Sequence, residues 1–253
     1  MKAYLDNNII VDIEEGIKSL DKVIECVNPA IKSIFFSSAH IGEAEELTDK
    51  SEKTKSERIS HRMKLIGEIT GHNYIYQNME NEVFFQIRTP ESVLETNRDT
   101  PSSSEIMKGL VSIMSEDQKQ QFRKMLGVDP KQINNYSPNN VLEQLNLKLT
   151  NWGMNQSFME MIDHANSFHP DSSSFGLNHK IASMFEFLDI IGYWKDKSTE
   201  KSNYARFWDS NHSFYAAHCD YFISDDTRTR NKAKVVYHQL GIGTKVVAST
   251  GKE

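Results

Sequence analysis

Short apolar runs followed by acidic residues recur at both ends of this chain of 253 residues, and they restrict the folds it can adopt. In an open parallel sheet, the ligand crevice lies beyond the carboxyl ends of the strands. Segments far apart in the sequence can therefore bring their carboxylates together at that edge. The acidic residues that follow or precede such runs are Asp6, Glu43, Asp209, Asp225 and Asp226.

Strand and helix patterns alternate in the first and last parts of the chain. This alternation predicts a mostly parallel sheet with helices on both faces, that is, a three-layer α/β/α arrangement. Period-two or continuous apolar runs predict strands at residues 2–5, 33–36, 74–76, 83–87, 221–224 and 244–248. Apolar residues at helical spacing predict helices at residues 17–27, 39–47, 56–70, 204–219 and 229–240.

The middle of the chain has a different pattern, in which strand-like runs are missing and helical patterns follow one another. These helical patterns cover residues 106–114, 117–126, 141–151, 158–165 and 179–193. We therefore expect a large helical insertion at residues 90–196 within a sheet domain formed by residues 1–89 and 197–253. The insertion is rich in Met, which suits core packing or an adaptable interface for a protein partner or for self-association into a homo-oligomer.

Composition excludes some classes of protein. The formal net charge of −6 argues against a sequence-independent DNA coat, which would be basic, but it does not exclude a nuclease. No apolar run approaches the ~18 residues of a membrane-spanning helix, and the N-terminus lacks a signal pattern, so we expect a cytoplasmic protein without membrane contact. The two cysteines are far apart, which argues against a zinc knuckle or a disulfide framework.

A cluster of carboxylates is unfavourable unless cations neutralise it. Carboxylate oxygens are ligands for hard divalent cations such as Mg²⁺ or Mn²⁺, so the acidic residues suggest a metal site and phosphodiester chemistry. Asp6 by itself has a simpler interpretation as a turn residue, with Asn7 and Asn8 as turn formers.

These segments resemble the PIN-domain family of metal-dependent nucleases. The residues that carry the resemblance are Tyr-Leu-Asp-Asn-Asn at 4–8, Ser-Ser-Ala-His-Ile-Gly-Glu at 37–43, and Cys-Asp-Tyr-Phe-Ile-Ser-Asp-Asp at 219–226, preceded by Asp209. The likeness covers roughly residues 1–75 and 200–248, and the middle of the chain has no counterpart in it. It implies a PIN-like sheet and nucleic-acid hydrolysis with Mg²⁺ or Mn²⁺, and it favours RNA over DNA.

The resemblance also assigns roles to residues. Asp6, Glu43, Asp209 and Asp226 would be the catalytic acids and would hold the metal, and Asp225 would add a water-mediated contact. Helical spacing alone does not distinguish Glu43 from Glu45 as the second acid; the family pattern selects Glu43. His212, three residues after Asp209, is expected to support the site or to pack beside it.

Two arginines follow the last acids of the chain. Arg228 and Arg230 lie at a predicted helix N-terminus, which favours anions, so they are candidates to bind a substrate phosphate, together with Asn8. A charged run of this kind is also typical of a solvated helix face.

Two alternatives to a nuclease stay open. The first is a catalytically silent PIN-like scaffold that binds RNA or a protein. The second is a haloacid-dehalogenase-like phosphatase, which needs an acid where this chain has Asn8. By family analogy alone, a nuclease of this kind fits a toxin–antitoxin or antiphage defence setting.

Overall fold

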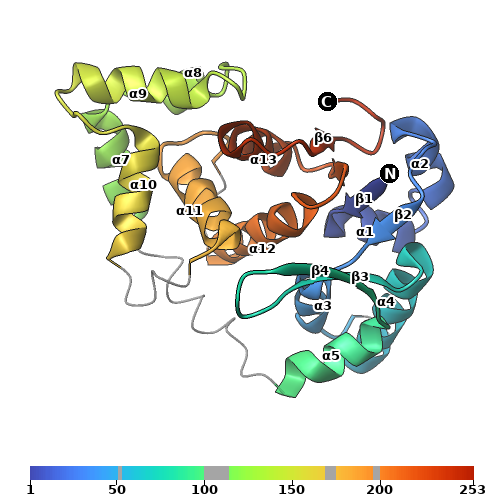
Figure 1. Ribbon diagram of the computed structural model, residues 1–253. Coiled ribbons are helices and arrows are strands. Elements are labelled where there is room, and N and C mark those ends of the chain that lie inside the picture. Colours follow the sequence, from blue (N-terminus) through green and yellow to red (C-terminus); the bar gives the residue numbers. More distant parts are fainter. Residues whose placement is uncertain (51–52, 100–113, 169–174, 196–199) are drawn as a thin grey trace. The chain divides into compact units, whose positions relative to one another are not determined.

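The computed structural model describes residues 1–50, 53–99, 114–168, 175–195 and 200–253 (Figure 1). The protein is an α/β protein with a four-stranded, all-parallel sheet, flanking helices and a small antiparallel hairpin, as the alternating pattern predicts. The chain forms two compact units. Unit 1 comprises residues 1–104, 215–226 and 244–253, and unit 2 comprises residues 105–214 and 227–243.

The parallel sheet belongs to unit 1 and has the strand order β2-β1-β5-β6. Its strands are β1 (Lys2–Leu5), β2 (Ser33–Phe35), β5 (Tyr221–Ile223) and β6 (Lys245–Val247). Tyr4 is aligned with Phe35 on one side and with Phe222 on the other. Strand β1 therefore lies between β2, which follows it in the first part of the chain, and β5, which comes from the last part. The residues that follow β1 and β5 start from neighbouring positions.

Unit 1 also contains an antiparallel hairpin, formed by β3 (Asn73–Gln77) and β4 (Val83–Ile87) (Figure 1). Phe36, just beyond β2, donates its backbone N–H to the Asn73 carbonyl at 3.0 Å. Its own carbonyl accepts from Ile75 N at 2.9 Å. These two bonds connect β3 to the end of β2, so that β4 lies farther from the parallel sheet than β3.

The helices of unit 1 are α1 (Asn7–Glu14), α2 (Leu20–Val27), α3 (Ser38–Glu45), α4 (Lys55–Thr70) and α5 (Pro90–Asp99). Helices α1 and α5 were not expected from the sequence. Asn7 and Asn8 resemble turn residues, yet the Asp6 side chain caps α1 and Ile9 and Ile10 of its first turns are buried. Tertiary burial therefore overrides local turn preference at this point.

Unit 1 has its own apolar core. It combines strand residues such as Leu5 and Ile223 with helix residues such as Ile41 and Met63, all with 1% exposure or less. Helices α3, α4 and α5 also contact one another. The sheet edge that carries the candidate acids is therefore supported by a close-packed interior.

Unit 2 is helical in the part that the structure describes. Its helices are α7 (Glu116–Met125), α8 (Pro130–Ile133), α9 (Val141–Asn151), α10 (Phe158–Ser167), α11 (Leu177–Ile190) and α13 (Thr227–Leu240), with most of α12 (Glu200–Ala216). The helix expected at 106–114 lies outside the described residues except for Met114. The boundaries of the two packed units differ from the limits at 89/90 and 196/197 that the sequence pattern predicts. No helix within the described ranges combines the length and the apolar character needed to cross a membrane.

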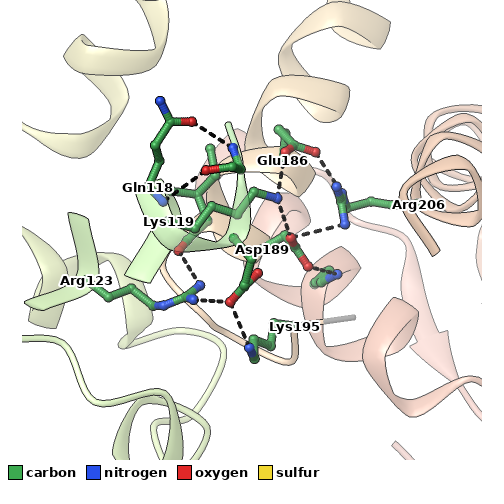
Figure 2. Close-up of polar contacts among 11 residues, drawn as sticks. Gln118, Lys119, Arg123, Glu186, Asp189, Lys195 and Arg206 are labelled. Carbon is green, nitrogen blue, oxygen red and sulfur yellow. Dashed lines mark hydrogen bonds and ion pairs between the residues drawn. The ribbon is translucent and has the colours of Figure 1, made fainter. Parts of the chain in front are cut away.

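A buried ionic network lies in unit 2 (Figure 2). Asp189 of α11, 5% exposed, accepts from Lys119 Nζ at 3.0 Å and lies 3.1 Å from Arg206 Nη1. Lys232 Nζ of α13 lies 3.7 Å from its other carboxylate oxygen. The same Lys119 and Arg206 also pair with Glu186, at 3.3 Å and 2.7 Å. The network thus joins helices α7, α11, α12 and α13 through one buried carboxylate.

Removing the Asp189 carboxylate is expected to destabilise the protein strongly, because buried cations would lose their partner. We expect Asp189→Ala to lower the free energy of unfolding by about 3–5 kcal/mol. The exposed pair of Lys64 and Glu68 is the control, and Glu68→Ala is expected to cost less than about 1 kcal/mol. Urea unfolding followed by circular dichroism measures both, and equal costs would contradict this account of the network.

Gly251 allows the turn after β6 to approach α2. Its φ is +77°, and a Cβ atom there would lie 2.3 Å from the Cys26 backbone oxygen. Gly16 has a similar φ of +70° with no atom within 4 Å of such a Cβ. Substitutions at Gly251 and at Gly16 therefore separate the cost of the left-handed backbone from the cost of the close contact.

We expect Gly251→Ala to destabilise the protein by about 1–3 kcal/mol more than Gly16→Ala, because only the first substitution adds a steric clash to backbone strain. Thermal and urea unfolding of the two variants measure the difference. Equal effects would show that the turn moves away from α2 at little cost.

Candidate functional site

Asp6 lies where β1 ends, and the residue is 3% exposed. Its Oδ1 accepts from Asn7 N at 2.8 Å, which caps α1. Its Oδ2 accepts from Asn8 Nδ2 at 2.6 Å and from Ser224 Oγ at 2.5 Å. These three hydrogen bonds fix the orientation of the carboxylate.

Ser224 connects the ends of β1 and β5. Its hydroxyl donates to Asp6 and accepts from the Asp226 backbone N–H at 3.2 Å. Asn8 also connects the two strand ends. Its Nδ2 lies 3.3 Å from Ser224 Oγ, and its Oδ1 accepts from Asp225 N at 3.2 Å. The side chain of Asn8 thus orients groups within the chain, a role that the sequence did not indicate.

Of the acids expected at the metal site, the structure connects Asp6 and Asp226 through this one hydroxyl. Glu43 lies on α3, which begins near the end of β2 and is capped by Ser37. Both Glu43 and Glu45 are half-buried, so exposure does not distinguish them as the second acid.

A buried polar cluster fixes the start of α3 against β1. The Tyr4 hydroxyl lies 2.7 Å from Ser37 Oγ, and burial raises the pKa of Tyr4 well above its ordinary value. His40 Nδ1 accepts from Ser37 N at 3.1 Å. The hydrogen therefore belongs on Nε2, which lies 2.8 Å from the Leu5 carbonyl and donates to it. This cluster positions the helix that carries Glu43.

Asp225 has different partners from Asp6. Lys18 Nζ lies 2.8 Å from its carboxylate, and Ser249 donates to it from N at 2.9 Å and from Oγ at 2.7 Å. Burial opposes ionisation of Asp225, but Lys18 and Ser249 outweigh it and lower its pKa. Lys18 also pairs with Asp12. No local motif marks Lys18 and Ser249 in the sequence, because their partner is distant along the chain.

The remaining candidates belong to unit 2. Asp209 is half-buried and His212 is 1% exposed, both on α12. On the first turn of α13, Arg228 is exposed, and Arg230 Nη2 donates to Thr227 Oγ1 at 3.2 Å. Unit 1 by itself therefore contributes Asp6, Glu43, Asp225 and Asp226.

The chemistry of the donors on unit 1 suits a hard divalent cation, because Asp6, Asp226 and Glu43 offer only oxygen ligands. Within the described part of the chain, no group of three or more His, Cys, Asp and Glu side chains is arranged to hold a metal ion. Protein sites for Mg²⁺ often use only one or two carboxylates, with water and substrate oxygens completing the coordination. The donor set on unit 1 fits a site of that kind.

Comparisons with protein-family models, with curated proteins and with solved structures found no match to this chain.

The link between Lys18 and Asp225 predicts a pH-dependent contribution to stability. Because the pKa of Asp225 is lowered on folding, its stabilising effect is present above the unfolded value of about 3.9 and is lost as the pH falls through the folded value. Lys18→Met should raise the pKa of Asp225. The stability difference from the wild type should then narrow as the pH falls below about 4.

Carboxyl NMR titration of Asp225, with urea unfolding at neutral and acidic pH, measures both effects. Lys22→Met is the control, because Lys22 is an exposed lysine on α2. A pKa of Asp225 that is unchanged in Lys18→Met would contradict the assigned ion pair.

Proposed function

We propose that this protein is a metal-dependent nuclease that hydrolyses phosphodiester bonds of nucleic acid, with RNA favoured over DNA. One observation carries the proposal. The buried Asp6 carboxylate is oriented by Asn8 and Ser224 where two adjacent parallel strands end, and Ser224 also binds the backbone of Asp226. That edge of a parallel sheet is where ligands bind in open α/β folds.

The contacts of Asp6 support a role beyond helix capping. A cap needs one acceptor oxygen, which Asn7 N already uses. The second oxygen accepts hydrogen bonds from Asn8 and Ser224. A carboxylate whose orientation is fixed by hydrogen bonds is suited to bind a cation.

The proposed ligands for Mg²⁺ or Mn²⁺ are Asp6, Asp226 and Glu43, and the PIN-domain resemblance adds Asp209 of α12. When bound, such an ion would activate a water molecule and stabilise the charge that develops on the phosphate oxygens. Asn8 and Ser224 would keep Asp6 in a fixed orientation throughout. We assign Asp225 a positioning role, because its carboxylate is bound by Lys18 and Ser249.

Substrate binding in this proposal depends on the start of α13. Arg228 and Arg230 lie in its first turn, where backbone N–H groups and the helix dipole favour a phosphate. The preference for RNA, the cytoplasmic location, a homo-oligomer or partner at residues 90–196 and a defence role stay proposals that derive from the sequence.

The decisive test is Asp6→Asn. Asparagine is as good a helix cap as aspartate, so α1 should be retained while the charge is lost. Since the loss of an outer partner of a metal ligand typically costs about 10–100-fold, we expect the loss of this ligand to lower cleavage at least about 100-fold. Purified protein incubated with labelled RNA and with labelled DNA, each with and without Mn²⁺, measures the effect.

Asp21→Asn is the matched control, because Asp21 is an exposed acid in the first turn of α2. It should cleave like the wild type, and circular dichroism should show that both variants are folded. Cleavage in Mn²⁺ that is unchanged by Asp6→Asn would exclude Asp6 from the reaction.

A second candidate function is a catalytically silent scaffold that binds RNA or a protein. It is favoured by the fact that both oxygens of Asp6 already accept hydrogen bonds. Titration calorimetry distinguishes the two functions. A scaffold would bind RNA without binding Mn²⁺, whereas a nuclease would bind Mn²⁺ and lose that binding in Asp6→Asn.

A further inference from the structure

The outer edge of β4 has an unusual concentration of exposed apolar side chains. Phe84 is 40% exposed, Phe85 39% and Ile87 73%, and Met79 in the hairpin turn is 97% exposed. Among the described residues, β4 pairs with β3 and with no other strand. Natural edge strands are commonly protected by lysine, proline or a bulge, and the sequence Val-Phe-Phe-Gln-Ile of β4 contains neither residue.

The hydrogen-bond pattern shows which backbone groups of β4 point outward. Glu82 O accepts from Asn78 N at 2.9 Å, and Arg88 N donates to His72 O at 2.9 Å, so even-numbered residues of this segment face β3. Because pairs alternate along an antiparallel ladder, the N–H and C=O groups of Val83, Phe85 and Ile87 face away from β3. These three residues present a complete set of donors and acceptors for one more strand.

We propose that the outer edge of β4 pairs with the same edge of a second copy of this chain, antiparallel about Phe85. Such two-fold pairing places Phe85 opposite Phe85 of the second copy and Val83 opposite Ile87 of the second copy. All three outward-facing residues then form hydrogen-bonded pairs. The side chains of Val83, Phe85 and Ile87 from both copies form one apolar row on the same face of the joined sheet.

Charge complementarity selects a second copy as the occupant. The pairing places Glu82, which is exposed, opposite Arg88 of the second copy, and it does so at both ends of the interface. Asn78 binds Glu82, and Ser92 and Thr96 bind Arg88, and all of these partners are neutral. The segment 82–88 is thus its own complement in shape, hydrogen bonding and charge, as a two-fold interface requires.

Phe85 is suited to be the centre of this interface. Its ring lies 4.9 Å from the ring of Phe35, and Lys2 Nζ lies 3.6 Å from its centroid. The side chain is thus held in place before association, which lowers the entropy lost on binding. A rigid aromatic anchor at the centre of an interface is typical of residues that dominate binding energy.

The test measures the mass of the full chain in solution by sedimentation and by light scattering after gel filtration, over a range of concentrations. We expect the wild type to form a dimer of twice its 29.1 kDa chain mass. Phe85→Arg places two like charges opposite each other and should weaken dimerisation at least about tenfold. Ile87→Arg, at a more exposed position, should act in the same direction if Phe85→Arg disturbs folding.

Leu147→Arg is the matched control, because Leu147 is an exposed apolar residue of α9 in unit 2, and it should leave the dimer intact. A charge swap tests the register. Glu82→Arg alone should weaken the dimer, and adding Arg88→Glu should restore it. Amide exchange at Val83, Phe85 and Ile87 should slow with dimerisation.

Two results would overturn the proposal. One is a wild type that stays monomeric up to about 1 mM. The other is a dimer that Phe85→Arg and Ile87→Arg both leave unchanged. A monomer with slow exchange at these three amides would mean that another part of the chain covers the edge, which also excludes a second copy.

Discussion

The hydrogen bond from Ser224 to Asp6 is the contact on which the organisation of unit 1 depends. It joins residues 218 positions apart, across the carboxyl ends of two adjacent parallel strands, at 2.5 Å. A short bond to a carboxylate is a strong one, and here it forms in a buried setting where an unpaired charge would be costly. The cap of α1, the orientation of Asn8 and the backbone of Asp226 all converge on these two side chains. The first and last segments of the chain thus meet at one chemically defined point.

Each unit contains a buried carboxylate that accepts hydrogen bonds from several side chains or backbone groups. Asp189 of unit 2 lies among Lys119, Arg206 and Lys232, so its charge is balanced within the protein. Asp6 of unit 1 accepts hydrogen bonds from Asn7, Asn8 and Ser224, which lower the cost of its burial. The first arrangement connects helices, and the second joins the ends of two adjacent strands. The cation-dependent function proposed for unit 1 depends on the orientation that these hydrogen bonds give to Asp6.

Much of the fold follows from local pattern. The strand at Lys2–Leu5 and the helix at Val141–Asn151 agree residue for residue with the apolar periodicity, because burial on a fixed face imposes that period. Helix α1 was missed, since its asparagines favour turns and the burial of Ile9 and Ile10 is decided by the core. At the site, the strand ends that carry Asp6 and Asp226 were visible in the sequence. The roles of Lys18, Ser224 and Ser249 depend on pairing between distant segments, which no local spacing encodes.

The sequence by itself determined the α/β class, the parallel sheet and the placement of acids after its strands, because periodicity and chain direction are local properties. Only the tertiary structure decided which neutral groups orient Asp6, which cation holds Asp225 and which edge of the hairpin is exposed. The physical reason is that hydrogen bonds and ion pairs act over a few ångströms. Their partners are therefore selected by the strand order β2-β1-β5-β6 and by the register of each pair, and both depend on the whole chain.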